Sequence, residues 1–202
     1  MPKVGRSIRS RQFVATHTGA LAGADAAYEA LFDAYGVLRV ADLDEMMDTL
    51  ELLTASGRPG PGGFAAVTDS AVSALLTDVA EDAGVPFARL GPGTLQGLRT
   101  ILSPALVPDN PLDAWDALEG AEQILTGSLL ALHDDPAVAV VGLSVDLTDE
   151  ESSDIGYVKV AGQVHAATTK PFLVLSHASD ALGARDAARL REAGVDVLVS
   201  CG

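Results

Sequence analysis

The order of apolar and polar residues along the chain predicts helices and strands in alternation. Apolar side chains recur at helical spacing over residues 24–35, 42–53, 71–83, 94–102, 118–132, 150–167 and 181–193. Short apolar or β-branched runs separate them at residues 37–40, 64–68, 86–90, 138–145, 172–176 and 195–199. Helices between successive strands imply parallel strands joined by right-handed crossovers. We therefore expect an α/β fold with a flavodoxin-like, doubly wound parallel sheet.

Two interruptions divide this pattern. Residues 56–63 read SGRPGPGG, and a stretch so rich in glycine and proline is the best candidate for a domain boundary. The run NPLD at residues 110–113 predicts a turn, because proline restricts the residue before it. We expect an α/β domain over residues 63–202, a helical connector over residues 24–56 and an N-terminal arm over residues 1–23. Doubly wound sheets bind ligands beyond the carboxyl ends of their strands.

Composition narrows the class of protein. Apolar residues make up 48% of the chain and aromatic residues only 4%, so the core must consist mostly of Ala, Val and Leu. No apolar run reaches the roughly 18 residues of a membrane helix, and no apolar stretch follows the basic N-terminus as in a secretory signal. The single cysteine, Cys201, permits no internal disulfide, which fits a reducing compartment. We expect a cytoplasmic protein without a membrane partner.

Charge is distributed unevenly along the chain. The first twelve residues contain four basic side chains and no acidic one. The rest of the chain therefore contains 9 of the 13 basic residues and all 28 acidic residues. An acidic body argues against nucleic acid as a partner. The basic arm can either meet a phosphate group or be simply solvated, and the sequence leaves both interpretations open.

His17 has the most distinctive surroundings of any residue in the chain. It stands between Thr16 and Thr18, and Gly19 and a run of small residues follow it before the helix expected at residues 24–35. Small residues let a backbone approach another molecule closely, and the N-terminus of a helix attracts anions. An imidazole nitrogen is a competent nucleophile toward phosphorus. A loop of this kind suits a histidine that carries a phosphoryl group, and it equally suits a solvated side chain.

Two stretches resemble the NDP-forming acyl-CoA (acetate–CoA) ligases of the succinyl-CoA synthetase superfamily: KVGRS at residues 3–7 and THTGALAGAD at residues 16–25. The resemblance implies that His17 accepts a phosphoryl group from an acyl phosphate and passes it to ADP. It also implies that Thr18 and Gly19 shape the phosphohistidine loop. Residues 1–23 would then comprise this loop and the end of a preceding domain.

The resemblance continues into the second half of the chain. Residues 65–84 resemble the start of the family's third flavodoxin-like domain, whose helix N-terminus helps to hold the phosphate, and NPLD at residues 110–113 matches a family turn. This implies that Ser70, Ala71 and Ser73 bind the phosphate. The family usually has a Gly-Gly pair at this turn, where close backbone contact is needed. Here Asp69 precedes Ser70 and Ala71, so we expect a negative charge where a phosphoryl group approaches.

The family's reaction, acid + CoA + ATP ⇌ acyl-CoA + ADP + phosphate, needs further domains. The sequence contains neither G-x-G-x-x-G nor G-x-x-x-x-G-K-[ST]. We therefore expect a fragment or subunit that is inactive alone and holds no cofactor or metal itself, with ATP/ADP, Mg²⁺ and CoA bound in the full enzyme. Its partners would be CoA-binding and ATP-grasp domains of the same or a partner chain and a small carboxylic acid. A homo-oligomer is compatible with the sequence.

Other interpretations stay open beside this one. The same domains occur as regulatory regions of protein lysine acetyltransferases, and the missing glycines fit that role. A non-catalytic assembly module is a third alternative. His177, with Ser176 and Asp180, superficially suggests a catalytic triad, but adjacent residues rarely give triad geometry. His133 is expected to serve a helix end, and the four histidines have no metal-ligand spacing.

Overall fold

The structure is a computed structural model that describes residues 1–19, 23–56, 58–69, 72–115, 119–148, 156–176 and 183–199. The chain forms two compact units, Met1–Leu50 and Glu51–Gly202. We call them the N-terminal unit and the C-terminal unit, and each is described by itself.

Within its described residues, the N-terminal unit contains three helices. They are α1 (Ile8–Thr18), α2 (Asp25–Tyr35) and α3 (Leu43–Ala55), the last of which continues into the C-terminal unit. The structure confirms the two helices expected over residues 24–35 and 42–53. The expected strand at residues 37–40 is wrong, because Val40 alone forms a single β-bridge, to Pro2. Helix α1 was not foreseen, because its sequence IRSRQFVATHT places few apolar side chains at helical spacing.

The C-terminal unit is a doubly wound sheet of five parallel strands. The strands are β1 (Gly63–Thr68), β2 (Leu112–Asp113), β3 (Val138–Val145), β4 (Phe172–Ser176) and β5 (Asp196–Val199). Their order is β2-β1-β3-β4-β5, and every neighbouring pair is parallel. The expected fold class is therefore confirmed.

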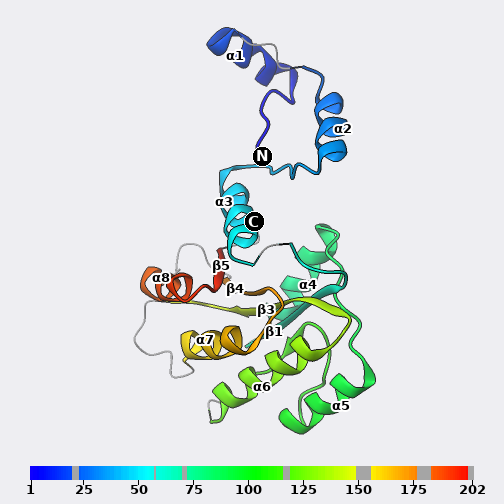
Figure 1. The fold of residues 1–202 in the computed structure, drawn as a ribbon, viewed down its shortest axis with the longest axis vertical. Coiled ribbons are helices and arrows are strands. Elements are labelled where there is room, and N and C mark those ends of the chain that lie inside the picture. The colour runs from blue at the N-terminus through cyan, green and yellow to red at the C-terminus, as the bar shows by residue number, and fades with distance from the viewer. Residues whose placement is uncertain are drawn as a thin grey trace. The chain divides into compact units, whose positions relative to one another are not determined.

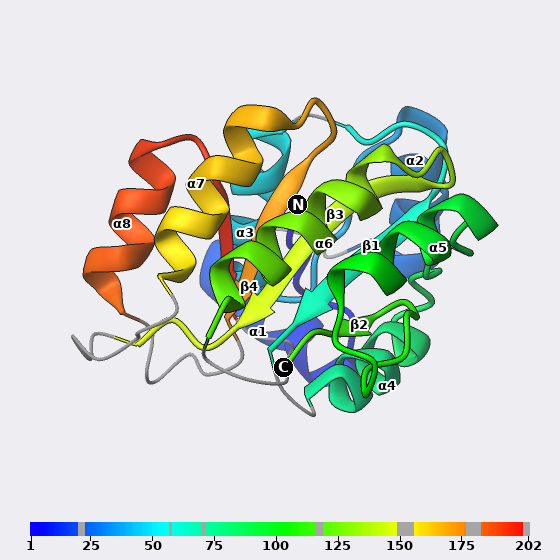
Figure 2. The ribbon, with the colours of Figure 1, turned by 90° about the horizontal axis from the view of Figure 1, so that it is seen from below.

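In the part of the chain that the structure describes, five helices join these strands and cover the two faces of the sheet. They are α4 (Val72–Asp82), α5 (Pro92–Ile101), α6 (Ala121–Asp134), α7 (Tyr157–Ala167) and α8 (Ala184–Glu192). Figure 1 shows α4 on one side of the sheet and α5, α6 and α7 on the other, and Figure 2 shows α5 to α8 as a row in front of the strands. The order of the strands explains why α4 and α7 lie on opposite faces. Because the chain leaves β1 toward β2 but leaves β3 toward β4, right-handed connections place α4 and α7 on opposite faces.

The core lies between the sheet and the row of helices. On each strand alternate residues face this side, as with Val141, Leu143 and Val145 of β3, which are fully buried. They pack in one cluster with helix residues such as Leu129 and Val160. Small and medium-sized aliphatic residues thus fill the core, as the low aromatic content predicts.

The edge of the sheet beside β1 differs from the sequence expectation. The strand expected at residues 86–90 is wrong, because only Phe87 bridges Phe64. The expected turn at residues 110–113 instead contains β2, which pairs with the end of β1. The Asn110 side chain lies between β1 and the segment at residues 86–90. Its Oδ1 accepts from the Ala66 amide at 3.1 Å, and its Nδ2 donates to the carbonyls of Phe64 and Ala88 at 2.9 and 3.0 Å. Asn110 therefore supplies contacts that a continuous neighbouring strand would make.

One long helix is shorter than the sequence suggests. A helix was expected over residues 150–167, but α7 begins at Tyr157, directly after Gly156 with a φ of +66°. This left-handed conformation suits glycine and is incompatible with a helix running through it. Residues 149–155 lie outside the described residues. Gly156 thus places Tyr157 at the very start of α7, close to the carboxyl end of the sheet.

Candidate functional site

His17 lies in the last turn of α1 and not in a loop. The helix ends at Gly19, which has a φ of +67° and whose amide donates to the Ala15 carbonyl at 3.1 Å. The prediction that His17 lies in a loop is therefore wrong. The helix ends at Gly19, and residues 20–22 lie outside the described residues. The His17 side chain is exposed. A helix end holds its backbone while leaving the imidazole open to another molecule.

The surface around His17 is apolar. Val4, Phe13, Val14 and Thr16 line a shallow depression together with His17. Phe13 is 64% exposed. The Thr16 hydroxyl donates within the helix, to the carbonyls of Gln12 and Phe13. The backbone of Thr18 forms the last residue of α1.

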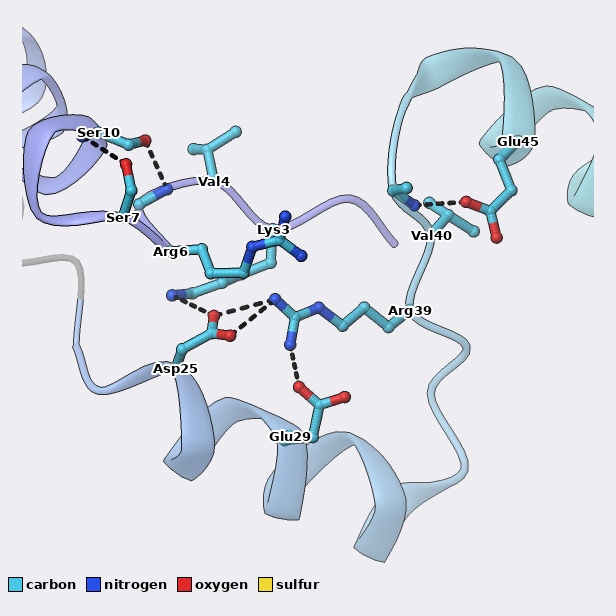
Figure 3. A pocket seen from close by; sticks show the side chains of 12 residues that line it. Lys3, Val4, Arg6, Ser7, Ser10, Asp25, Glu29, Arg39, Val40 and Glu45 are labelled. Atoms are coloured by element: carbon cyan, nitrogen blue, oxygen red, sulfur yellow. Dashed lines mark hydrogen bonds and ion pairs between the residues drawn. The ribbon is translucent and has the colours of Figure 1, made fainter. Parts of the chain in front are cut away.

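A second cluster ties the basic arm to α2 (Figure 3). Lys3 Nζ lies 3.2 Å from Asp25 Oδ1 and 4.5 Å from the centroid of the Tyr28 ring. Arg39 donates to both Asp25 oxygens at 3.0 Å and also pairs with Glu29. The hydrogen bond from Arg39 and the charges of Arg39 and Lys3 lower the pKa of Asp25, against the opposing effect of burial. These basic residues are therefore engaged with carboxylates, and Lys3 is not a freely solvated side chain.

This cluster lines a cleft of about 690 Å³ within the N-terminal unit. Arg6 and Ser7 also border the cleft, and the Ser7 hydroxyl caps α1 by accepting from the Ser10 amide at 3.1 Å. Since Asp25 links residues 3 and 39, the cluster fixes the segment that leads into α1. It thereby supports the helix that carries His17.

At the carboxyl edge of the sheet, Asp69 follows β1 and Asp146 follows β3. The Tyr157 hydroxyl, from the start of α7, donates a hydrogen bond to Asp69 Oδ2. Tyr157 is only 8% exposed, and burial raises the pKa of its hydroxyl, as do the hydrogen bond to Asp69 and the charges of Asp69 and Asp146. The phenol therefore stays protonated and acts as a donor.

Tyr157 was missed by the sequence analysis, because it was placed inside a continuous helix. The available signal was Gly156, a helix breaker directly before it. The expected phosphate-binding residues Ser70 and Ala71 lie outside the described residues. Ser73 is half-buried in the first turn of α4, where its carbonyl accepts from the Thr77 hydroxyl at 2.7 Å. His17 and Ser73 belong to different units.

The other histidines carry structural contacts or fall outside the structure's description. His133 Nε2 accepts from the Thr169 amide at 3.1 Å, which leaves Nδ1 to donate to Asp134 at 3.0 Å. His177 and Asp180 lie outside the described residues. Within the described ranges, no group of three or more His, Cys, Asp or Glu side chains could hold a metal ion. In the same ranges no helix combines the length and apolarity needed to cross a membrane.

Comparison with known proteins shows related sequences. A family model described as "Succinyl-CoA ligase like flavodoxin domain" matches residues 1–53. The alpha subunit of acetate–CoA ligase [ADP-forming] II from Pyrococcus furiosus is 31% identical over 86% of this chain and 38% of its own length. Trans-feruloyl-CoA synthase FCS1, from an unknown prokaryotic organism, is 30% identical over 76% of this chain and 22% of its own length. The chain thus spans less than two fifths of these curated relatives.

The solved structures agree with the fold. A dinucleotide-forming acetyl-coenzyme A synthetase 1 from Ca. Korarchaeum cryptofilum, in complex with phosphate and ADP, superposes with a TM-score of 0.77 at 21% identity. The match covers 96% of this chain and 41% of that one. PH0766 from Pyrococcus horikoshii OT3 matches with a TM-score of 0.70 at 22% identity, over 87% of this chain and 40% of its own.

Proposed function

Because the chain belongs to the family of ADP-forming acyl-CoA ligases, within the succinyl-CoA synthetase superfamily, we propose that it forms part of such an enzyme and that His17 carries its phosphoryl group. The overall reaction is acid + CoA + ATP ⇌ acyl-CoA + ADP + phosphate. The observation that carries the proposal is an exposed histidine at a helix end, in the segment THTGALAG, inside the part of the chain that the family model matches.

The chemistry at His17 is nucleophilic substitution at phosphorus. In the direction of ATP synthesis, a neutral imidazole nitrogen attacks the phosphorus of an acyl phosphate. The new N–P bond forms as the P–O bond to the acyl group breaks, and the electron pair leaves with the carboxylate. The phosphoryl group then passes from nitrogen to the terminal oxygen of ADP. The phosphoryl group passes from one acceptor to the next in each step. Water must be kept away from His17, because it would otherwise hydrolyse the N–P bond.

The remaining parts of the proposal concern binding. Thr18 and Gly19 shape the phosphohistidine loop, and Ser70, Ala71 and Ser73 bind phosphate. CoA-binding and ATP-grasp domains, on the same or a partner chain, supply the sites for CoA, nucleotide and Mg²⁺. The acid is a small carboxylic acid, and the setting is the cytoplasm. The two relatives named above are a CoA ligase subunit and a CoA synthase, which favours this function over a regulatory region of an acetyltransferase.

The test is phosphorylation of the complete enzyme by ATP and Mg²⁺. We expect acid-labile, base-stable phosphate on His17, and we expect His17→Asn to lose both this label and at least about 10³-fold in turnover, as covalent nucleophiles do. The matched control is His165→Asn, a histidine in α7 that the proposal does not use. A complete enzyme that turns over normally while its His17 stays unlabelled would refute the proposal.

A further inference from the structure

The N-terminal unit leaves most of its large apolar side chains uncovered. Among the described residues of the whole chain, fifteen large apolar side chains are exposed, and eleven of these belong to the N-terminal unit. Within its described residues, Phe32 and Val40 are the only apolar side chains that are buried. A solvent-exposed apolar surface of this extent is typical of a site of association.

Helix α3 carries an exposed apolar stripe. Leu43, Met47 and Leu50 follow one another at helical spacing, and they are between 49% and 64% exposed. Asp44 lies three residues before Met47, so these two side chains are neighbours on the helix surface. Residues 41–50 contain four acidic side chains and no basic one. The stripe therefore suits a partner that combines apolar and basic side chains.

Helix α1 has the opposite charge and the same apolar character. Ile8 and Phe13 are 73% and 64% exposed. Arg9 lies four residues before Phe13, at a spacing that makes helix side chains neighbours. Residues 6–12 contain three arginines and no acidic residue. Within the described part of the chain, no ion pair involves Arg9 or Asp44, so each helix presents a charge that the other can meet.

A second copy of the chain offers both surfaces a complement. Over the residues that the structure describes, α1 and α3 do not pack along each other within one copy (Figure 1). Outside its first twelve residues the chain has 9 basic and 28 acidic side chains, so whole molecules repel and only a local match of charge can join them. The basic, apolar α1 of one copy and the acidic, apolar α3 of another provide such a match.

We propose that the N-terminal unit is a homodimer interface, in which α1 of each copy packs against α3 of the other. Because the two contacts are the same, a twofold axis closes the dimer and leaves neither surface for a third copy. Stable interfaces bury roughly 800 Å² on each partner, an area that eleven exposed large side chains are able to supply. This inference is independent of the proposed function.

The contact leaves His17 open. It is centred on Ile8 and Arg9 in the first turn of α1, whereas His17 lies in the last turn. At about 1.5 Å per residue, Arg9 and His17 are separated by about 12 Å along the helix axis. Dimerisation and phosphoryl transfer are therefore compatible, and the dimer can be tested without measuring activity.

The test mixes two charge-reversal variants of the 202-residue chain. In Arg9→Glu both contacts of the dimer bring acidic groups together, and in Asp44→Lys both bring basic groups together. Each variant alone should dimerise at least about tenfold more weakly than wild type, because like charges across an interface oppose binding. In an equimolar mixture the two variants meet with opposite charges in both contacts, so the affinity should return to within about threefold of wild type. Sedimentation velocity at concentrations up to about 0.1 mM measures these affinities.

Arg185→Glu in α8 and Asp78→Lys in α4 are the matched controls, because they make the same charge changes at exposed positions outside the contact. Both should dimerise like wild type, and circular dichroism separates a loss of association from a loss of folding. Wild type that stays monomeric up to about 0.1 mM would overturn the inference and assign the surface to a different domain or subunit. Single variants that dimerise like wild type, or a mixture as dissociated as its two components, would overturn it as well.

Discussion

Asp196 is a carboxylate enclosed by the protein at the start of β5. It is 1% exposed, and its Oδ2 accepts from the Ser56 hydroxyl, whereas Oδ1 has no hydrogen-bond partner among the described residues. Burial raises the pKa of Asp196, and the charge of Glu51 raises it further. The hydrogen bond from Ser56 and the charge of His165 act in the opposite direction. A carboxyl whose pKa is higher in the folded state favours folding when protonated and loses that stability as pH rises through the folded pKa.

Asp196→Asn should therefore stabilise the protein at neutral pH. The amide has a similar shape and cannot ionise, so we expect the free energy of unfolding at pH 7 to rise by about 1 kcal/mol. The gain should vanish below about pH 4, where the aspartate is protonated in both states. Urea unfolding across this pH range measures it, with Asp78→Asn on the exposed face of α4 as control. A variant less stable than wild type at pH 7 would contradict the prediction.

At the scale of the element, the start of β1 depends on two glycines with different demands. Gly62 has a φ of +145°, which side chains rarely adopt. Gly63 is limited by space, because an added Cβ would lie 2.6 Å from the Ala88 amide nitrogen and 2.8 Å from its Cα. Both glycines belong to the Gly/Pro-rich stretch that was expected to be a boundary. The end of this stretch is thus already part of the sheet.

Gly63→Ala should destabilise the C-terminal unit by about 2–3 kcal/mol, because backbone atoms must move to admit a methyl group. Gly60→Ala is the matched control within the same stretch. No atom lies within 4 Å of its added Cβ, so we expect a change below about 0.5 kcal/mol. Thermal or urea unfolding of both variants decides the matter: equal losses at the two positions would show that backbone freedom, and not the contact with Ala88, governs this turn.

At the scale of the whole molecule, net charge shapes stability. The chain carries a formal net charge of −15 at pH 7, and such an excess of one sign repels itself in the compact state. The pairs of opposite charge in the C-terminal unit, such as Lys159–Glu122 and Arg189–Asp186, each join an exposed basic side chain to a half-buried carboxylate, and such pairs near the surface contribute little. Screening should therefore remove more repulsion than attraction.

We accordingly expect the melting temperature to rise by about 3–6 °C between about 0.02 and 0.3 M NaCl. Circular dichroism at pH 7 measures this rise. Repeating the measurement near the pI of about 4.4 provides the control, because the net charge there is close to zero and the effect of salt should disappear. A melting temperature that falls with salt at pH 7 would show that ion pairs outweigh the net repulsion.

The fold was predictable because its strands are strongly patterned. β3 and β4 were placed residue for residue, since VAVVGLSV and FLVLS are short, mostly apolar runs of the kind typical of strands buried on both faces. The site was predictable only where a local motif marks it, as at His17. Asn110, Tyr157 and the Lys3–Asp25–Arg39 cluster depend on contacts between residues 14 to 88 positions apart. Contacts between residues so far apart leave no periodic pattern in the sequence.

The edge strand β5 is closed to further pairing by two side chains. Glu51 of α3 accepts from the Val197 amide at 2.9 Å and from Arg191 Nε at 2.8 Å, and Arg191 donates to the Val197 carbonyl at 2.7 Å. A strand arriving from another molecule would find both backbone groups of Val197 occupied. Exposed edges of sheets are templates for edge-to-edge aggregation. The Glu51–Arg191 pair therefore blocks growth of the sheet past β5 at this residue and protects a concentrated protein from self-association through this edge.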